Sequence, residues 1–210
     1  MTPGPDFDLL LRSITPVPMA RLLYRGVSLN SLLRLSPPRP LYASRSPNRY
    51  NLRGTKTLYF GEDFASAYAE TVQENANLLL NNATREQASG TGYVLEEPEP
   101  IVLFAVRARV ERLLDLADQG VLSKLGITEA SLLGPWRWDS SMGRSTLTQS
   151  LGDAAYRAGL EAIRYPSQKR HDPLLRTDPA CWAVFEDRVT APSKLEVSDV
   201  SKYLQGALPI

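Results

Sequence analysis

The stretch Ile101-Val-Leu-Phe-Ala-Val-Arg-Ala-Arg-Val110 is the clearest strand in this chain of 210 residues. It begins as a continuous apolar run and ends in alternation, which is typical of a strand that lies partly in the centre of a sheet. Helices and strands alternate irregularly on both sides of it, so we expect an α+β fold rather than a doubly wound parallel sheet. The other predicted strands are short and cover residues 21–28, 57–60, 161–165 and 181–189.

A helix is predicted over about residues 64–79, with Asp63 as its N-cap. Glu70 lies about 160° from the apolar side of this helix at 100° per residue, so it belongs to the polar face. The apolar residues recur every four positions and form the expected buried stripe: Phe64, Tyr68 and Val72.

Proline-rich segments flank these elements. Residues 1–18 contain four prolines, which predicts an extended arm with one short helical turn at Leu9–Ser13. Residues 36–51 contain four more, which predicts a long loop, and long loops in compact domains are often functional. Trp136 and Trp138 are expected in a loop or turn. A second helix is predicted over residues 148–158, where Gly159 ends it.

The composition excludes several classes of protein. The 24 basic and 23 acidic residues give a net charge of +1, so no global field favours direct binding to nucleic acid. Cys181 is the one cysteine and lies in an apolar run, which predicts a buried, inert thiol. The one histidine, His171, and the lack of a suitably spaced carboxylate cluster predict no metal site. With no membrane-length apolar run and no signal pattern, we expect a cytoplasmic protein.

Common phosphate-binding and nucleophile motifs are missing from the sequence. It contains no G-x-S-x-G elbow, no G-x-x-x-x-G-K-[ST] loop and no G-x-G-x-x-G after a strand. A dinucleotide could still be held by arginine side chains, because a guanidinium matches phosphate oxygens in a bidentate manner.

Seven residues form the candidate site. Two arginines, a tyrosine and a glutamate among them fall on strand ends, a loop and a helix, where they could hold a pyrophosphate and a ribose while a glycosidic bond breaks. The seven residues are Arg25, Tyr59, Glu70, Arg49, Ser167, Tyr24 and Tyr50. Tyr24 and Tyr50, which flank the arginines, could instead serve only in packing. Ser167 follows a proline and could instead cap a turn.

The chain resembles the RES domain family, named for its arginine, glutamate and serine. The resemblance covers about residues 21–190, and no single segment is specific on its own. Its segments follow one another in the family's order: Leu23-Tyr-Arg-Gly26, Asn48-Arg-Tyr-Asn51, Thr57-Leu-Tyr-Phe60, Ala67-Tyr-Ala-Glu70, Leu114-Asp-Leu116, Gln149-Ser-Leu-Gly152, Ala158-Gly159, Arg164-Tyr-Pro-Ser167 and Ala183-Val-Phe185. The loop after Arg49 and the length of residues 75–100 depart from the family pattern.

The resemblance implies an ADP-ribosyltransferase-like mixed β-sheet core with flanking helices. It also implies a toxin of a toxin–antitoxin pair that breaks down NAD+ as its substrate, needs no cofactor, and is covered at the active site by an Xre-type antitoxin. Inorganic phosphate is a partner only if the bond is cleaved by phosphorolysis. The expected organisation is an N-terminal arm (1–20), a RES domain (21–190) and a C-terminal tail (191–210). The oligomeric state stays open, a homo-oligomer within the complex included.

The resemblance also implies a mechanism, with catalytic roles for Arg25, Tyr59 and Glu70 and substrate-binding roles for Arg49, Ser167, Tyr24 and Tyr50. Arg25 and Arg49 would neutralise the pyrophosphate, and Glu70 would bind the ribose and stabilise its developing positive charge. Tyr59 would stack on or hydrogen-bond the nicotinamide, and Ser167 would hold a phosphate, a ribose oxygen or the acceptor. Hydrolysis and phosphorolysis both fit this set. Two alternatives remain, a protein ADP-ribosyltransferase and a module that binds NAD+ or ADP-ribose without cleaving it.

Overall fold

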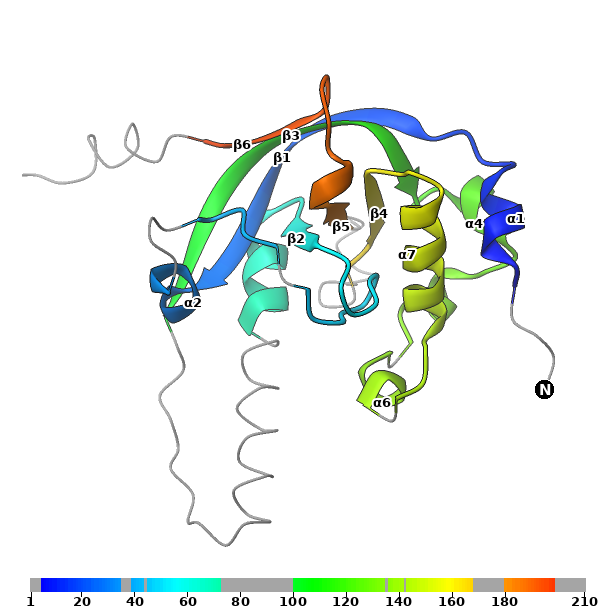
Figure 1. Cartoon of the computed structure of the whole chain (residues 1–210), viewed down its shortest axis with the longest axis horizontal. Coiled ribbons are helices and arrows are strands. Elements are labelled where there is room, and N and C mark those ends of the chain that lie inside the picture. Colours follow the sequence, from blue (N-terminus) through cyan, green and yellow to red (C-terminus); the bar gives the residue numbers. More distant parts are fainter. Residues whose placement is uncertain are drawn as a thin grey trace, which may run out of the picture.

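The structure, a computed structural model, describes residues 5–34, 39–43, 45–72, 100–134, 136–141, 143–167 and 180–198. A helix that carries no label in Figure 1 covers residues 64–72. The other elements, in chain order, are α1 (Phe7–Leu11), β1 (Val17–Ser28), α2 (Leu29–Leu33), β2 (Thr57–Gly61), β3 (Ile101–Asp115), α4 (Gln119–Leu125), α5 (Glu129–Leu132), α6 (Trp136–Ser141), α7 (Leu147–Arg157), β4 (Ala162–Pro166), β5 (Ala180–Phe185), a 3-10 turn (Glu186–Arg188) and β6 (Lys194–Val197).

Two long strands shape the sheet. β1 and β3 pair antiparallel from Val17 opposite Leu113 to Ser28 opposite Ile101, and they arch over the shorter strands β2, β4 and β5 (Figure 1). The strand order is β1-β2-β5-β4-β3-β6, and the pairing of β1 with β3 closes this sheet on itself. β3 and β4 run parallel while the other described pairs are antiparallel, so the sheet is mixed. The α+β class with a mixed sheet and flanking helices is confirmed.

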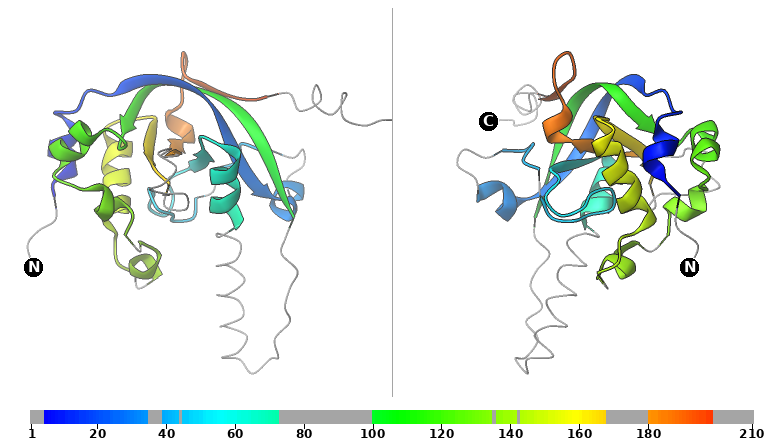
Figure 2. Two further views of the ribbon diagram at one scale, coloured as in Figure 1. Left: turned by 180° about the vertical axis from the view of Figure 1, so that it is seen from behind. Right: turned by 45° about the vertical axis from the view of Figure 1, so that its right-hand side comes forward.

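β5 lies in the middle of the sheet, and all six of its residues are buried. Cys181 and Ala183 face a hydrophobic cluster formed with α7, α1 and α4, which cover one side of the short strands (Figure 2). Trp182 and Val184 face the second cluster, under the arch of β1 and β3. A short, continuously apolar strand fits this place because both of its faces are covered.

The predicted strands are present, with two longer than expected. β1 begins at Val17 and β3 continues to Asp115, because the two strands support each other along almost their whole length. The prediction that all flanking strands are short is therefore wrong for β1. α7 is confirmed, with a capping box at Thr146 and a positive φ of 74° at Gly159 after its end.

The N-terminal residues differ from the extended arm that the prolines suggested. α1 starts at Phe7, where the Asp6 side chain accepts a hydrogen bond from the backbone of Leu9. Phe7 and Leu11 are four residues apart and both are buried, so they lie on one face of this short helix against α7 and α4. This segment is thus part of the core that supports the central strands.

Two further predictions are wrong. Trp136 and Trp138 lie in a helix, α6, rather than in a loop. The stripe expected to be buried on the helix at residues 64–72 is instead its exposed side, with Phe64 at 57%, Tyr68 at 49% and Val72 at 36% exposure. Ser66 and Ala67 are the buried residues of this helix. The polar and small side chains therefore face the protein, and Glu70 faces with them.

Candidate active site

A cavity of about 180 Å³ lies between β1, β2, the loop at residues 46–51 and the helix at residues 64–72. Its wall also includes single residues from α6, β4 and β5. Five of the seven sequence-predicted site residues line it: Tyr24, Arg25, Arg49, Tyr59 and Glu70. Segments that are far apart in the sequence thus bring a carboxylate and two guanidinium groups to one cavity.

Arg25 reaches this cavity from β1, and its guanidinium binds three backbone carbonyl oxygens. Nε donates to Pro40 at 3.1 Å, Nη2 to Tyr42 at 3.2 Å and Nη1 to Tyr59 at 3.1 Å. The ring of Phe60 lies 5.8 Å from the guanidinium carbon. Arg25 therefore fixes the loop before the cavity to β1 and β2, in addition to placing a positive charge in the cavity wall.

Arg49 is a buried cation, and the residue is only 4% exposed. Nη2 donates to the backbone oxygen of Leu132, and the guanidinium lies 6.0 and 5.5 Å from the ring centres of Tyr50 and Tyr165. Within the described part of the chain, Nε has no hydrogen-bond partner and no carboxylate forms an ion pair with this residue. A buried charge without a counterion is costly, so this position favours binding of an anion.

Tyr59 holds the loop that carries Arg49. Its hydroxyl donates to Oδ1 of Asn51 at 2.8 Å and accepts from the backbone N–H of Tyr50 at 3.0 Å. Nδ2 of Asn51 in turn donates to the backbone oxygens of Ser46 and Leu52. The polar end of Tyr59 is thus occupied by the protein, which supports a structural role for the hydroxyl rather than a hydrogen bond to nicotinamide.

Glu70 lines the cavity from the helix at residues 64–72, and Ser167 donates to its Oε1 at 3.3 Å. Ser167 is buried at the end of β4 and does not line the cavity. The helix approaches β1 so closely that a Cβ at Gly26 would lie 2.2 Å from the hydroxyl oxygen of Thr71. Only a glycine allows this approach, which brings the carboxylate of Glu70 to the cavity.

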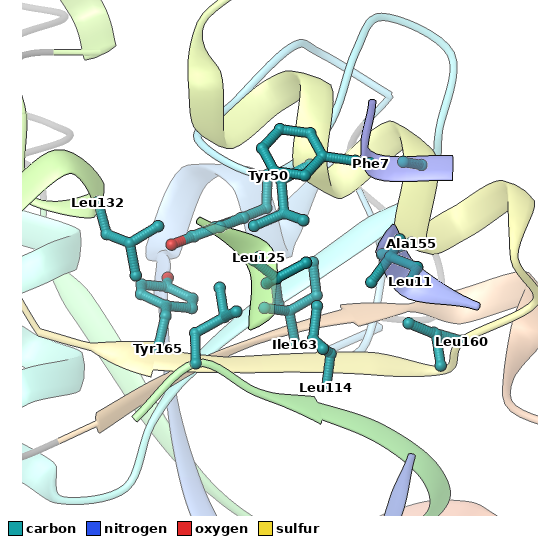
Figure 3. Close-up of a cluster of buried hydrophobic side chains, with 14 of the residues drawn as sticks. Phe7, Leu11, Tyr50, Leu114, Leu125, Leu132, Ala155, Leu160, Ile163 and Tyr165 are labelled. Carbon is teal, nitrogen blue, oxygen red and sulfur yellow. The ribbon is translucent and has the colours of Figure 1, made fainter. Parts of the chain in front are cut away.

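Tyr50 does not line the cavity and is fully buried in the cluster beside α7, where its ring centre lies 4.4 Å from that of Tyr165 (Figure 3). Its side chain therefore has a packing role, in contrast to the predicted contact with substrate. Burial raises the pKa of both phenols. Burial, followed by the charge of Glu70, also raises the pKa of Cys181, so this thiol is protonated and suited to packing, as its sequence context predicts.

Arg164, within the Arg164-Tyr-Pro-Ser167 segment, belongs to a charge network outside the cavity wall. It forms a bidentate pair with Glu62, at 2.6 and 3.2 Å, and a further bond to Asp115 at 3.1 Å. Trp182 donates to the same Glu62. Burial alone would raise the pKa of Glu62, but the hydrogen bonds from Arg164 and Trp182 outweigh it and lower the pKa below 4.5. This network joins β2, β3 and β4 beneath the site.

Sequence reasoning missed the residues that support the loop at residues 48–51. Gln149 donates from Nε2 to the backbone oxygen of Asn48, and a Cβ at Gly152 would lie 2.0 Å from the backbone oxygen of Tyr50. The loop therefore rests directly on the first turns of α7. The Gln149-Ser-Leu-Gly152 segment carried the signal, since a polar residue and a glycine one turn apart suit contact with a backbone.

Some predictions fall outside the described residues. They concern His171, most of residues 75–100 and the tail after residue 198. Within the described ranges, no group of three or more histidine, cysteine or acidic residues is placed to hold a metal ion. No helix in these ranges has the length and apolar character needed to cross a membrane.

Comparisons with known proteins agree with this architecture. No curated protein matches the chain. Among solved structures, the chain is similar to a chain of the M. tuberculosis MbcT–MbcA toxin–antitoxin complex, with a TM-score of 0.58 and 14% identity over 92% of this chain and 89% of that one. At this identity the similarity shows a shared fold. The RES domain model matches residues 30–203, a range that includes Arg49, Tyr59, Glu70 and Ser167. The chain therefore belongs to the RES domain family.

Proposed function

We propose that this chain is the toxin of a toxin–antitoxin pair and that it cleaves the nicotinamide–ribose bond of NAD+. One observation carries the proposal. A single cavity is lined by the carboxylate-bearing Glu70 and by two arginines, Arg25 and Arg49, from three separate segments. Membership of the RES domain family and the fold shared with a chain of a toxin–antitoxin complex support the same function.

The carboxylate suits the chemistry of this bond. When nicotinamide leaves, the ribose develops oxocarbenium-like positive charge, as in glycoside hydrolysis. A carboxylate held in a cavity stabilises such a charge more strongly than it would in water. Glu70 has this role in our proposal, and Ser167 orients it through the hydrogen bond to Oε1. Ser167 therefore acts on the carboxylate and not on the substrate.

The arginines suit the other end of the substrate. The pyrophosphate of NAD+ carries two negative charges, and charge-assisted hydrogen bonds from guanidinium groups bind such oxygens strongly. Arg49 is the better placed of the two, since it is buried and its Nε has no hydrogen-bond partner in the described part of the chain, whereas Arg25 binds three backbone carbonyl oxygens. The cavity volume of about 180 Å³ is below the roughly 300–1,000 Å³ of most ligand pockets. In our proposal it holds the reacting part of the dinucleotide, with the adenosine outside.

The proposed partners follow from the same function. An Xre-type antitoxin would cover this cavity, NAD+ would enter it as substrate, and water or inorganic phosphate would accept the ADP-ribosyl group. The reaction needs no further cofactor, and a chain that consumes NAD+ would act in the cytoplasm. The structure similar to this chain is itself a toxin–antitoxin complex, which supports the antitoxin as partner.

Chromatography of the reaction products tests the proposal. The purified chain, freed of antitoxin, is incubated with NAD+ in the presence and absence of inorganic phosphate. Nicotinamide should be released by the wild-type chain and by Glu196→Gln, which changes an exposed glutamate paired with Lys194. Glu70→Gln should fold normally and lose at least about a hundredfold in rate, the scale of a lost electrostatic stabiliser.

The products also separate the alternatives. A requirement for phosphate selects phosphorolysis over hydrolysis. Label from NAD+ on a protein, with little free ADP-ribose, would favour a protein ADP-ribosyltransferase. Tight binding of intact NAD+ by the wild-type chain would contradict cleavage and leave a binding module.

A further inference from the structure

The guanidinium of Arg49 lies over two tyrosine rings that come from different parts of the chain. Its central carbon is 5.5 Å from the ring centre of Tyr165, on β4, and 6.0 Å from that of Tyr50, the next residue in the loop. The two ring centres are 4.4 Å apart, so the rings pack against each other beneath the cation. At such distances the negative face of an aromatic ring attracts a guanidinium. The rings therefore offset part of the cost of burying this charge.

Support by rings leaves the charge of Arg49 available to a ligand. Burial raises the pKa of both phenols, so Tyr50 and Tyr165 are uncharged at neutral pH. Among the described residues no carboxylate forms an ion pair with Arg49, and its Nε has no hydrogen-bond partner. A carboxylate in place of a ring would compete with the oxygens of a bound anion. The rings attract the guanidinium without neutralising it.

Tyr165 is the ring that connects Arg49 to the sheet. It is buried and lines the cavity, whereas Tyr50 is fully buried and does not line it. Tyr50 is also the neighbour of Arg49 in one loop, so it moves with that loop. Tyr165 instead belongs to β4, where it pairs with Cys181 of the central strand β5. Its ring therefore relates the position of the guanidinium to the centre of the fold.

The same end of β4 also contacts the carboxylate of the cavity. Alternate residues of an extended chain share one face and are about 7 Å apart, so Tyr165 and Ser167 lie on the same side. Ser167 follows directly after β4 and donates to Oε1 of Glu70 at 3.3 Å. Two residues of one short segment thus support the cation and the carboxylate separately.

We propose that Tyr165 is a positioning residue whose ring holds the guanidinium of Arg49 in its anion-binding orientation. A side chain that is already held in place loses less freedom when a ligand binds, which improves affinity. That the anion is the pyrophosphate of NAD+ rests on the proposed function, whereas the support of Arg49 by the ring does not. Tyr165 therefore acts on substrate binding, while Ser167 acts on the cleavage step through Glu70.

Two substitutions separate the ring from its hydroxyl. Tyr165→Leu removes the ring and keeps a buried apolar side chain, and Tyr165→Phe keeps the ring. Tyr165→Leu should bind inorganic pyrophosphate and ADP-ribose, measured by calorimetry, about 3- to 10-fold more weakly, the scale of ordering one long side chain. Its KM for NAD+ should rise by about the same factor while kcat stays within about twofold of the wild-type value. Tyr165→Phe should match the wild-type chain within about twofold in each measurement.

Phe185→Leu is the matched control, because it removes a fully buried ring from the same hydrophobic cluster. The ring of Phe185 contacts that of Tyr156, at 5.4 Å between ring centres. Phe185→Leu should lower the unfolding temperature, as Tyr165→Leu should, but leave the affinity for both anions within about twofold. If Tyr165→Leu does not fold, trifluorophenylalanine at position 165 replaces it in the test. This side chain keeps the size of the ring but loses its negative face, so it should bind pyrophosphate at least about twofold more weakly than Tyr165→Phe.

The measured affinities decide the proposal. Wild-type affinity in Tyr165→Leu, or an equal loss in Phe185→Leu, would overturn it. An equal loss in Tyr165→Phe would also overturn it, because the hydroxyl and not the ring would then be responsible. If the wild-type chain binds pyrophosphate but never cleaves NAD+, weaker binding by Tyr165→Leu would support the positioning role while the proposed cleavage fails. A wild-type chain that binds neither anion would contradict both.

Discussion

Replacing Tyr59 by phenylalanine should destabilise the fold, because the Tyr59 hydroxyl makes two hydrogen bonds that hold the loop at residues 48–51. The change removes the donor to Oδ1 of Asn51 and the acceptor for the N–H of Tyr50. Tyr50 and Asn51 are 0% and 1% exposed, so water does not replace the lost partner. Each unsatisfied buried group costs about 1–3 kcal/mol, and two that share one hydroxyl should cost about 3 kcal/mol together. For a chain of this size the unfolding temperature should fall by about 6–12 °C.

Urea unfolding followed by circular dichroism measures this cost, with Tyr156→Phe as the matched control. The hydroxyl of Tyr156 donates to the exposed Asp187 at 2.7 Å, so its loss should change the free energy of unfolding by less than about 1 kcal/mol. If the free energy of unfolding of Tyr59→Phe lies within about 0.5 kcal/mol of the wild-type value, the loop is not held by this hydroxyl. A weaker affinity for NAD+ at unchanged stability would instead support the predicted contact with nicotinamide.

Three other changes test the supports of the site. Ser167→Ala should lower kcat of NAD+ cleavage about three- to tenfold with KM unchanged, since it loosens Glu70; steady-state kinetics would contradict this if only KM rose. Arg164→Met should cost about 3 kcal/mol at pH 7 in urea unfolding. Because the folded-state pKa of Glu62 is lowered, the wild-type chain should lose stability as pH falls below 4.5. If Arg164→Met loses as much free energy of unfolding as the wild-type chain over this pH range, the linkage to the pair of Arg164 and Glu62 is refuted. Gly26→Ala should lower the free energy of unfolding by about 1–3 kcal/mol, because the added methyl group clashes with the helix at residues 64–72. An unchanged free energy of unfolding would show that this helix can move away from β1 at little cost.

The strands and the helix α7 could be predicted from the sequence because local patterns determine them. β5 reads as an apolar run, and α7 has a capping box at its start and a glycine after its end. The closure of the sheet by β1 and β3 could not be predicted in the same way. It depends on which strands pair over long sequence distances, and hydrophobic periodicity does not specify partners.

The helix at residues 64–72 shows where periodicity misleads. Its aromatic stripe is a regular amphipathic pattern, yet the opposite side packs against the strands. Small residues on that side allow close approach at Gly26, and this contact places Glu70 in the cavity. The glycine in Leu23-Tyr-Arg-Gly26 is part of a family segment, but its use as a contact surface depends on the tertiary structure.

The sequence indicated which residues lie together better than it indicated the contacts of each one. Arg25, Arg49, Tyr59 and Glu70 line one cavity. Tyr50 has a buried ring in the core, which its sequence position beside an arginine did not distinguish from a contact with substrate. Residue types indicate chemistry, whereas hydrogen-bond partners decide which atoms remain available for a ligand.

A crystal structure of Glu70→Gln with intact NAD+ tests the central claim most directly. Our account predicts the nicotinamide–ribose bond beside residue 70 and a phosphoryl group against Arg49. Density for the nicotinamide and its ribose outside this cavity, for example in the groove lined by Arg107 and Lys194, would contradict the account.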